Sequence, residues 1–283
     1  MDYNEQLQQL IKNALTEDIG DGDHSTLSSI NSDAQGKAVL KIKEDGVLAG
    51  VEVAEKIFRF MQPNIIFTAF KNDGDDMKYG ETAFEVSAKV HTILQTERLV
   101  LNTMQRMSGI ATLTKIYVDK LKGYTTKLLD TRKTTPNFRL LEKEAVRIGG
   151  GVNHRLGLYD MIMLKDNHID YCGGIEKAIN KAYEYVQANK LGLRIEVETR
   201  SIADVKKVMA VGKVDRIMLD NFTPELITEA LKIIGKKYET EASGGINLGN
   251  IESYAATGVD FISSGAVIHQ ARSLDLSLKA VII

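Results

Sequence analysis

The chain has 283 residues, 43% of them hydrophobic and 26% charged, which are ordinary values for a globular protein of one large or two medium domains. The formal charge of -2 excludes an overall basic field for a nucleic acid or an anionic membrane, so any anion must be bound by local clusters of Arg and Lys. Cys172 is the single cysteine, which excludes an intramolecular disulfide.

The beginning of the chain predicts an amphipathic helix rather than a targeting segment. Residues 4–17 carry Leu7, Leu10, Ile11 and Leu15 at helical spacing. This acidic stretch lacks the basic and continuously apolar regions of a signal peptide. No stretch of the sequence approaches the roughly 20 apolar residues that span a bilayer, so we expect a cytoplasmic protein without a membrane or nucleic-acid partner.

The region up to about residue 121 predicts an α+β arrangement. A polar turn over 18–26 precedes short strand-like runs, which glycines punctuate. The expected strands are 37–43, 65–70 and 82–86, with a helix over 53–61. From residue 90 to about 121 the pattern is helical and long, and Ser108-Gly109 is the expected break in it.

The rest of the chain alternates between strand and helix and predicts an α/β barrel, open or closed. Apolar runs typical of buried parallel strands are each followed by a helical stretch. The six expected strands are 126–130, 161–165, 194–198, 216–220, 240–243 and 260–264. Six such units favour a barrel over a mixed sandwich, and the carboxyl ends of its strands would form the active-site face.

Glycine turns after the last two expected strands predict a phosphate site. Ser243-Gly244-Gly245 follows the fifth strand and Ser264-Gly265 follows the sixth. One such turn alone is usually only a tight connection. Two in succession favour phosphate, because glycine lets backbone N–H groups approach an anion closely.

The middle strands end on carboxylates, and the early ones lead into cations. Glu198 and Asp220 directly follow apolar runs, and two carboxylates on neighbouring strands suit Mg²⁺, which otherwise takes waters and substrate phosphates. The cations are Arg132, Lys133, Arg155 and Lys165, with Arg139 and His154 in the same runs. These cations would repel one another unless an anion neutralised them, and Arg can grip a carboxylate in two places. The pattern therefore predicts a polyanion site, part phosphorylated and metal-bound, part carboxylate.

The sequence leaves two roles open for each of the two candidate histidines. His154 and His168 fit either a general acid/base role or a purely positioning one. Cys172 has no evident base beside it and is expected to act as a small apolar residue. Residue patterns alone go no further, because several enzyme classes act on phosphorylated anions in barrels.

The ordered motifs resemble the quinolinate phosphoribosyltransferase family, also called carboxylating nicotinate-nucleotide pyrophosphorylase. The resemblance covers nearly the whole chain and begins with EDIGDGDHST and TERLVLNTMQRMSGIAT. It is strongest across LLDTRKTTPNFR and GGGVNHRLGLYDMIMLKDNH, and it ends with IEVE, IMLDNF, ASGGI and ISSGA. Each motif alone is weak, whereas the ordered set is highly specific.

This resemblance implies a fold and an assembly. The expected fold is an N-terminal α/β sandwich over 1–115 joined to an incomplete α/β barrel over 116–283, whose extreme C-terminus can pack back on the N-terminal domain. The expected assembly is a homodimer or a higher oligomer in which each N-terminal domain caps the partner's barrel. Arg98 is then expected to reach the quinolinate in the neighbouring subunit's site.

The resemblance also implies residue roles. Lys165, Glu198 and Asp220 are the expected catalytic residues, the two carboxylates also lying near the ribose and Mg²⁺. The expected substrate-binding residues are Arg98, Arg132, Lys133, Arg139, His154, Arg155, Lys165 and His168, with Ser243, Gly244, Gly245, Ser264 and Gly265 holding the 5-phosphate. Family members often carry glycine where this chain has Asn137, which leaves the shape of that loop and the substrate affinity open.

The implied reaction joins quinolinate to phosphoribosyl pyrophosphate with Mg²⁺ as cofactor and yields nicotinate mononucleotide, pyrophosphate and carbon dioxide, a step of NAD biosynthesis. A related transferase acting on nicotinate and a molybdenum-associated homologue are alternatives. So is a barrel lyase or aldolase that uses Lys165 as a Schiff-base nucleophile. A metabolite-binding protein without turnover is the alternative that is not an enzyme.

Overall fold

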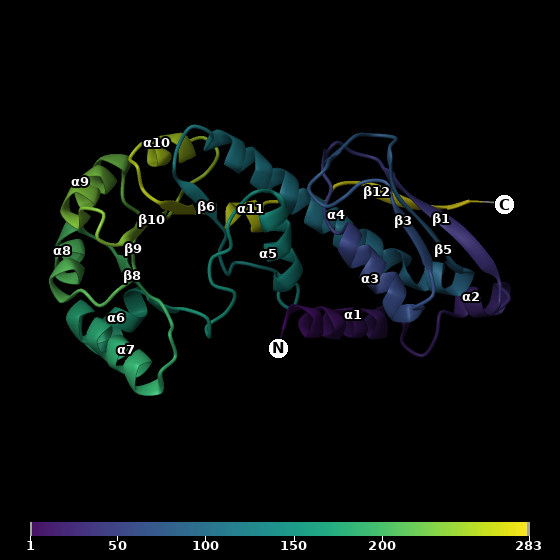
Figure 1. The fold of residues 1–283 in the computed structure, drawn as a ribbon, viewed down its shortest axis with the longest axis horizontal. Coiled ribbons are helices and arrows are strands. Elements are labelled where there is room, and N and C mark those ends of the chain that lie inside the picture. The colour runs from purple at the N-terminus through teal and green to yellow at the C-terminus, as the bar shows by residue number, and fades with distance from the viewer. Residues whose placement is uncertain (1, 282–283) are drawn as a thin grey trace. The chain divides into compact units, whose positions relative to one another are not determined.

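The computed structural model describes residues 2–281 and divides into two compact units (Figure 1). The first unit is discontinuous in sequence and comprises Met1–Lys115, Thr134–Gly150 and Val267–Ile283. The second comprises Ile116–Lys133 and Gly151–Ala266. The chain therefore crosses between the units more than once, and each unit is described by itself below.

The first unit is built on a four-stranded antiparallel sheet in the order β12-β1-β5-β3. The strands are β1 (Gln35–Ile42), β3 (Ile66–Ala69), β5 (Thr82–Lys89) and β12 (Leu276–Val281), and β2 (Gly46–Val47) pairs separately with β4 (Asp76–Met77). The three strands expected from the sequence are present. Strand β12, which the sequence pattern did not predict, pairs with β1 from Lys37↔Val281 to Ile42↔Leu276.

Helices complete this unit, and aromatic side chains join one of them to the sheet. The helices are α1 (Tyr3–Ile19), α2 (His24–Ser29), α3 (Val51–Met61), α4 (Val90–Lys120, whose last residues enter the second unit) and α5 (Arg139–Ile148). Phe58 of α3 packs edge-on against Phe84 of β5 with ring centroids 6.2 Å apart. The expected polar turn over 18–26 is shorter than predicted, because α1 runs to Ile19 and α2 begins at His24, with Asp23 accepting from the N–H of Thr26 as its N-cap.

The break expected at Ser108-Gly109 is wrong, since α4 runs unbroken through both residues. Gly109 is required there by packing, because a β-carbon would overlap the backbone carbonyl of Arg272. Ser108 is fully buried and accepts from the N–H of Ala49 at 3.0 Å. Both residues thus mark a close approach of backbone to the helix, which a local pattern does not distinguish from a break.

The second unit is a six-stranded, all-parallel sheet in the order β6-β11-β10-β9-β8-β7. The strands are β6 (Lys127–Leu129), β7 (Ile162–Leu164), β8 (Ile195–Thr199), β9 (Arg216–Asp220), β10 (Glu239–Ser243) and β11 (Phe261–Ser263). All six strands expected from the sequence are present. Because β6 and β7 end the order without pairing with each other among residues 2–281, the barrel is open.

Helices lie on the outer side of this curved sheet, as Figure 1 shows for α7, α8 and α9. The helices of this part of the chain are α6 (Asp166–Cys172), α7 (Ile175–Asn189), α8 (Ile202–Val211), α9 (Pro224–Ile234), α10 (Ile251–Ala255) and α11 (Ala266–His269, which enters the first unit). Their starts follow ordinary capping chemistry: Ser201 and Thr223 accept backbone N–H groups at the beginnings of α8 and α9. Nowhere in residues 2–281 is a helix both long and apolar enough to cross a membrane.

Candidate functional site

The carboxyl ends of the parallel strands in the second unit bring the predicted charged residues together. Glu198 lies in β8 opposite Met218 of β9, and Asp220 of β9 lies opposite Ser243 of β10. Side chains at alternate positions of a strand share one face, so Glu198 and Asp220 project from the same side of the sheet. Three neighbouring strands thus contribute two carboxylates and a hydroxyl to one edge.

The two carboxylates interact with each other and with Lys165. Burial and the charge of Asp220 raise the pKa of the Glu198 carboxyl, while Lys165 opposes that shift. The Lys165 Nζ lies 4.0 Å from Oε2 of Glu198, with the lysine side chain half exposed and the glutamate largely buried. Two neighbouring carboxylates favour a nearby cation, and their oxygen atoms are the ligands that Mg²⁺ prefers.

The glycine turn after β10 has the backbone conformation that a close approach requires. Gly244 and Gly245 have φ angles of +94° and +64°, which side chains rarely adopt. The N–H of Asn221 donates to the carbonyl oxygen of Ser243 at 2.8 Å and holds the start of this turn against the end of β9. After β11, Ser264 is buried and donates its hydroxyl to the carbonyl of Ile246 at 3.1 Å. The two predicted phosphate-binding turns are therefore adjacent and are held by these hydrogen bonds.

Two arginines of the second unit lie near each other. Arg155 is buried, and burial followed by the positive charge of Arg132 lowers the pKa of its guanidinium. Arg155 Nη1 donates to the carbonyl of Met161 at 3.3 Å. Lys133, next to Arg132, is exposed. A pair of guanidinium groups that disfavour each other's charge is suited to an anion placed between them.

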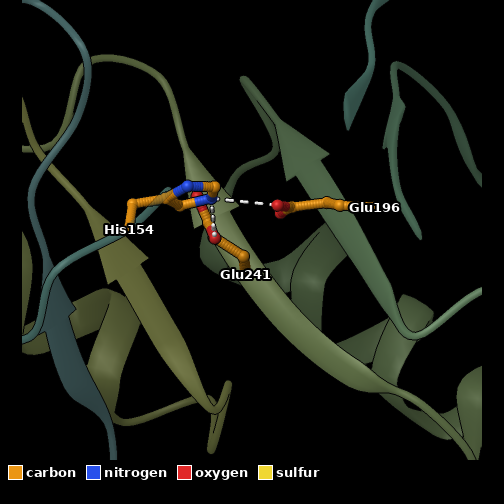
Figure 2. A group of neighbouring side chains, drawn as sticks. All are labelled: His154, Glu196 and Glu241. Carbon is orange, nitrogen blue, oxygen red and sulfur yellow. Dashed lines mark hydrogen bonds and ion pairs between the residues drawn. The ribbon is translucent and has the colours of Figure 1, made fainter. Parts of the chain in front are cut away.

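His154 lies in a buried cluster with two glutamates, Glu196 of β8 and Glu241 of β10 (Figure 2). Its Nε2 is 2.9 Å from Oε2 of Glu196 and 3.3 Å from Oε2 of Glu241. Burial opposes protonation of the ring, but the two carboxylates outweigh burial and raise the pKa of His154 to about 9. Burial and the charge of Glu241 raise the pKa of Glu196 to about 7. Folding thus favours an additional proton within this cluster.

The backbone at His154 indicates which of these groups holds that proton. The N–H of Arg155 donates to Nδ1 of His154 at 2.7 Å, and a backbone N–H can only donate. Nδ1 must then be unprotonated, so the ring carries its single proton on Nε2, facing the carboxylates. An imidazolium would need the Arg155 hydrogen bond to break. The hydrogen-bond geometry therefore outweighs the raised pKa of His154, and the additional proton belongs to the glutamate pair.

His168 has a local role in the structure. Its Nδ1 accepts from the backbone N–H of Lys165 at 3.1 Å, across the first turn of α6, and the side chain is exposed. This contact stabilises the beginning of α6, directly after the end of β7.

The remaining predicted residues belong to the first unit. Arg98 lies on α4 with its side chain 70% exposed, and its Nη2 is 3.7 Å from Oε1 of its neighbour Glu97. Arg139 begins α5 and donates from Nε to the hydroxyl of Thr134 at 2.9 Å. Asn137 has a φ of +63°, in the left-handed region that glycine adopts freely and Asn tolerates better than most residues. The loop can therefore keep a glycine-like conformation with asparagine in place.

Three buried acidic residues at the site were not among the residues predicted from sequence. Asp130 accepts from the N–H of His154 at 2.8 Å and from the side-chain amide of Asn153 at 2.7 Å. Glu196 and Glu241 hold the ring of the same histidine. The signal that could have found the glutamates is strand alternation, because Glu196 is two positions before Glu198 and Glu241 is two before Ser243. Their partner His154, however, comes from a loop 42 residues before Glu196 and still farther from Glu241 in the chain.

Comparisons with known proteins match this architecture over nearly the whole chain. The N-terminal domain model of quinolinate phosphoribosyl transferase matches residues 23–108, and the C-terminal domain model matches residues 110–279. A quinolinate phosphoribosyltransferase [decarboxylating] of Nicotiana tabacum is 45% identical, over 96% of this chain and 82% of that protein. A probable nicotinate-nucleotide pyrophosphorylase [carboxylating] of Bacillus subtilis is 40% identical, over 98% and 94% respectively.

Solved structures agree with these matches. The crystal structure of NadC from Streptococcus pyogenes superposes with a TM-score of 0.89 at 41% identity and covers 98% of both chains. The structure of the nicotinate-nucleotide pyrophosphorylase from Francisella tularensis superposes with a TM-score of 0.89 at 38% identity, over 98% of this chain and 97% of that one.

Proposed function

The chain belongs to the quinolinate phosphoribosyltransferase family, and from that premise we propose that it transfers a phosphoribosyl group from phosphoribosyl pyrophosphate to quinolinate. The products are nicotinate mononucleotide, pyrophosphate and carbon dioxide, which makes the protein a decarboxylating pentosyltransferase of NAD biosynthesis. This reading agrees with the names of relatives that are 40–45% identical over 96–98% of the chain.

The observation that carries the proposal is the proximity of Arg132 and Arg155 in the second unit. Quinolinate has two adjacent carboxylates on a planar ring, and planar guanidinium groups bind carboxylates through paired hydrogen bonds. Arg155 is buried and its charge is disfavoured by burial and by Arg132, so a dianion between them would relieve both effects. Nicotinate has one carboxylate and would neutralise this pair less completely.

We place the phosphoribosyl group at the strand ends beside these arginines. Backbone N–H groups of the turns at Gly244-Gly245 and Ser264-Gly265 would bind the 5-phosphate. Glu198 and Asp220 would face the ribose, where negative charge stabilises the positive charge that develops at C1 as pyrophosphate leaves. Lys165, 4.0 Å from Glu198, would contribute a cation at the same point.

Glu198 and Asp220 also fit a Mg²⁺ ion, because both offer oxygen ligands at the strand ends and their mutual repulsion favours a cation. A bound Mg²⁺ would supply charge neutralisation for the leaving pyrophosphate. The protein groups would supply the rest by holding the two substrates in register. The quinolinate nitrogen forms a bond to C1 of the ribose as the bond from C1 to pyrophosphate breaks. The bond from C2 to its carboxylate then breaks and releases carbon dioxide, the adjacent positive nitrogen stabilises the electron pair left on C2, and a proton from water takes the place of the carboxylate. This series of reaction steps needs no side-chain nucleophile.

We further propose that the protein acts in the cytoplasm as a homodimer or a higher oligomer with shared active sites. Arg98 is 70% exposed on α4, and its Nη2 lies 3.7 Å from Oε1 of its sequence neighbour Glu97. Its guanidinium is therefore accessible to a ligand held by another subunit. In the proposed assembly it contacts quinolinate bound to the partner's barrel.

A turnover assay tests the function directly. The protein is incubated with phosphoribosyl pyrophosphate, Mg²⁺ and either quinolinate or nicotinate, and nicotinate mononucleotide is followed by chromatography. Product from quinolinate alone supports the proposal. Product from nicotinate alone, or from neither acid with folded protein, contradicts it. The Arg155→Lys variant gives a sharper test, because lysine keeps the charge but loses the fork, and KM for quinolinate should rise about 10-fold or more.

A further inference from the structure

The buried cluster of His154, Glu196 and Glu241 has no part in the reaction steps above. Both glutamates have fully buried side chains, on strands β8 and β10 of the second unit. Oε1 of Glu196 and Oε1 of Glu241 have no hydrogen-bond partner among residues 2–281. Interiors of parallel barrels are usually filled by branched apolar side chains, and burying a carboxylate costs several kcal/mol. Glu241 also accepts from Nη1 of the buried Arg216 at 3.0 Å, which gives it a structural role as well. Glu196 makes its hydrogen bond to His154, and a purely structural role at Glu196 would be met better by Leu or Val.

The cluster orients the histidine ring from both sides. Nε2–H donates to Glu196 at 2.9 Å, with Glu241 at 3.3 Å, and Nδ1 accepts the backbone N–H of Arg155 at 2.7 Å. The backbone N–H of His154 itself donates to Asp130 at 2.8 Å. The ring, its tautomer and the two successive amides at 154 and 155 are therefore fixed by hydrogen bonds.

This chain of contacts ends at a residue assigned to substrate. Arg155 follows His154 directly, and its guanidinium is one of the pair that would bind quinolinate. Arg155 N–H is 2.7 Å from the ring that the glutamates hold, so a shift of the ring moves the backbone from which the guanidinium extends. Displacements of about 1 Å in a positioning group can cost about 100-fold in rate.

We propose that Glu196, with Glu241 as a second acceptor, is a positioning residue that acts through His154 to hold Arg155 in place for the pyridine dicarboxylate. This inference deepens the proposed function and rests on it. His154 thus links the buried glutamates inside the barrel to Arg155, the arginine that would bind quinolinate. It is not the general acid or base of the reaction, because both of its ring nitrogens have protein partners.

Three variants separate this role from general structural support. Glu196→Leu removes the acceptor while filling the interior, and because it leaves the Nε2–H of His154 without its nearer partner, thermal unfolding is measured beside the kinetics to confirm that the variant is folded. We expect KM for quinolinate to rise 10- to 100-fold, with KM for phosphoribosyl pyrophosphate changed less than about twofold. Glu196→Gln retains a carbonyl oxygen that can accept from Nε2–H, so it should restore KM for quinolinate to within about threefold of the original.

The matched control is Glu239→Leu. Glu239 lies on the same face of β10, two positions before Glu241, and its Oε2 contacts Arg194 and Arg216 rather than His154. Arg216 donates to Glu241 through a different nitrogen, Nη1, so that contact and both contacts of His154 are retained in the control. This variant should leave both KM values unchanged even if it lowers thermal stability. Equal losses for both substrates in Glu196→Leu, or an unchanged KM for quinolinate, would overturn the proposal.

A measurement independent of activity examines the histidine itself. In ¹⁵N-histidine-labelled protein, His154 should show a protonated Nε2 and an unprotonated Nδ1, and its signals can be assigned by their loss in His154→Gln among the five histidines of the chain. Glu196→Leu should keep this protonation pattern, which Arg155 sets, but should shift the Nε2 and Nε2–H signals, because the hydrogen bond to Glu196 is lost. Two protonated nitrogens in the unsubstituted protein would overturn the proposed orientation. If that protein makes no nicotinate mononucleotide, the proposed function and the substrate named here both fail, and these signals still decide whether Glu196 orients His154.

Discussion

The side chain of Asn221 occupies the space that a β-carbon at Gly244 would need, so the end of β9 and the glycine turn after β10 are packed without room for another atom. Gly244 also has a φ of +94°, which disfavours any other residue. Gly244→Ala should therefore displace Asn221, raise KM for phosphoribosyl pyrophosphate at least tenfold and lower stability by more than about 1 kcal/mol. Steady-state kinetics and denaturant unfolding measure both effects.

The control for this prediction is Gly258→Ala in the same unit. Gly258 has a φ of +83° but open space where a β-carbon would lie. It should show the backbone cost of about 1 kcal/mol without the change in KM. Equal KM values for the two variants would contradict the proposed phosphate turn.

A buried ion pair in the first unit should be important for stability. Arg106 donates from Nε and Nη2 to Oε1 of Glu142 at 3.0 and 2.8 Å, and the N–H of Thr135 donates to Oε2 of the same fully buried glutamate at 2.8 Å. Glu142→Ala should cost about 3–5 kcal/mol, because it leaves a charge without its partner. Glu144→Ala on the same helix removes a partly exposed pair with Arg147 and should cost less than about 1 kcal/mol. Similar losses in both variants by urea unfolding would refute this distinction.

The pH dependence of stability follows from the cluster around His154. The pKa of Glu196 is raised to about 7 from an ordinary value of 4.5, whereas the His154 ring stays neutral because its Nδ1 accepts from the N–H of Arg155. A raised pKa means that the folded protein binds more protons, so this stabilisation is complete below pH 4.5 and is lost as the pH rises from there through about 7. The thermal midpoint should fall over this interval, and it should fall less in Glu196→Gln. Parallel pH profiles for the two proteins would exclude the cluster as the cause.

Mixing experiments test the shared active site. Arg98→Ala and Lys165→Ala should each abolish turnover. Subunit exchange between them gives heterodimers with one intact site, so a 1:1 mixture should recover about one quarter of the original activity. A mixture of Lys165→Ala with Asp220→Ala should stay inactive, because both changes lie on the barrel side. Absence of recovery in the first mixture, with exchange confirmed, would rule out the role of Arg98 in a partner's site.

Much of the second unit could be predicted from the sequence because the relevant information is local. Polar residues stand at or directly after the carboxyl ends of the parallel strands, as Glu198 does near the end of β8 and Asp220 at the end of β9, and parallel strands place these ends at one edge. The two glycine turns could also be predicted, because each is a short local motif directly after a strand. Once the strand order of the sheet is known, the position of each strand-end residue relative to the others follows from its place in the chain.

Only the tertiary structure decided what depends on distant segments. Strand β12 alternates apolar and polar residues from Leu276 to Lys279, but its partner is β1, over 230 residues earlier in the chain, and that pairing is set by tertiary structure. Gly109 looked like a helix break, although it is there because the backbone at Arg272 packs against it. The contact of His154 with Glu196 and Glu241 depends on register across three strands and on a loop. Local periodicity records which face a side chain takes, whereas its partner is set by long-range packing.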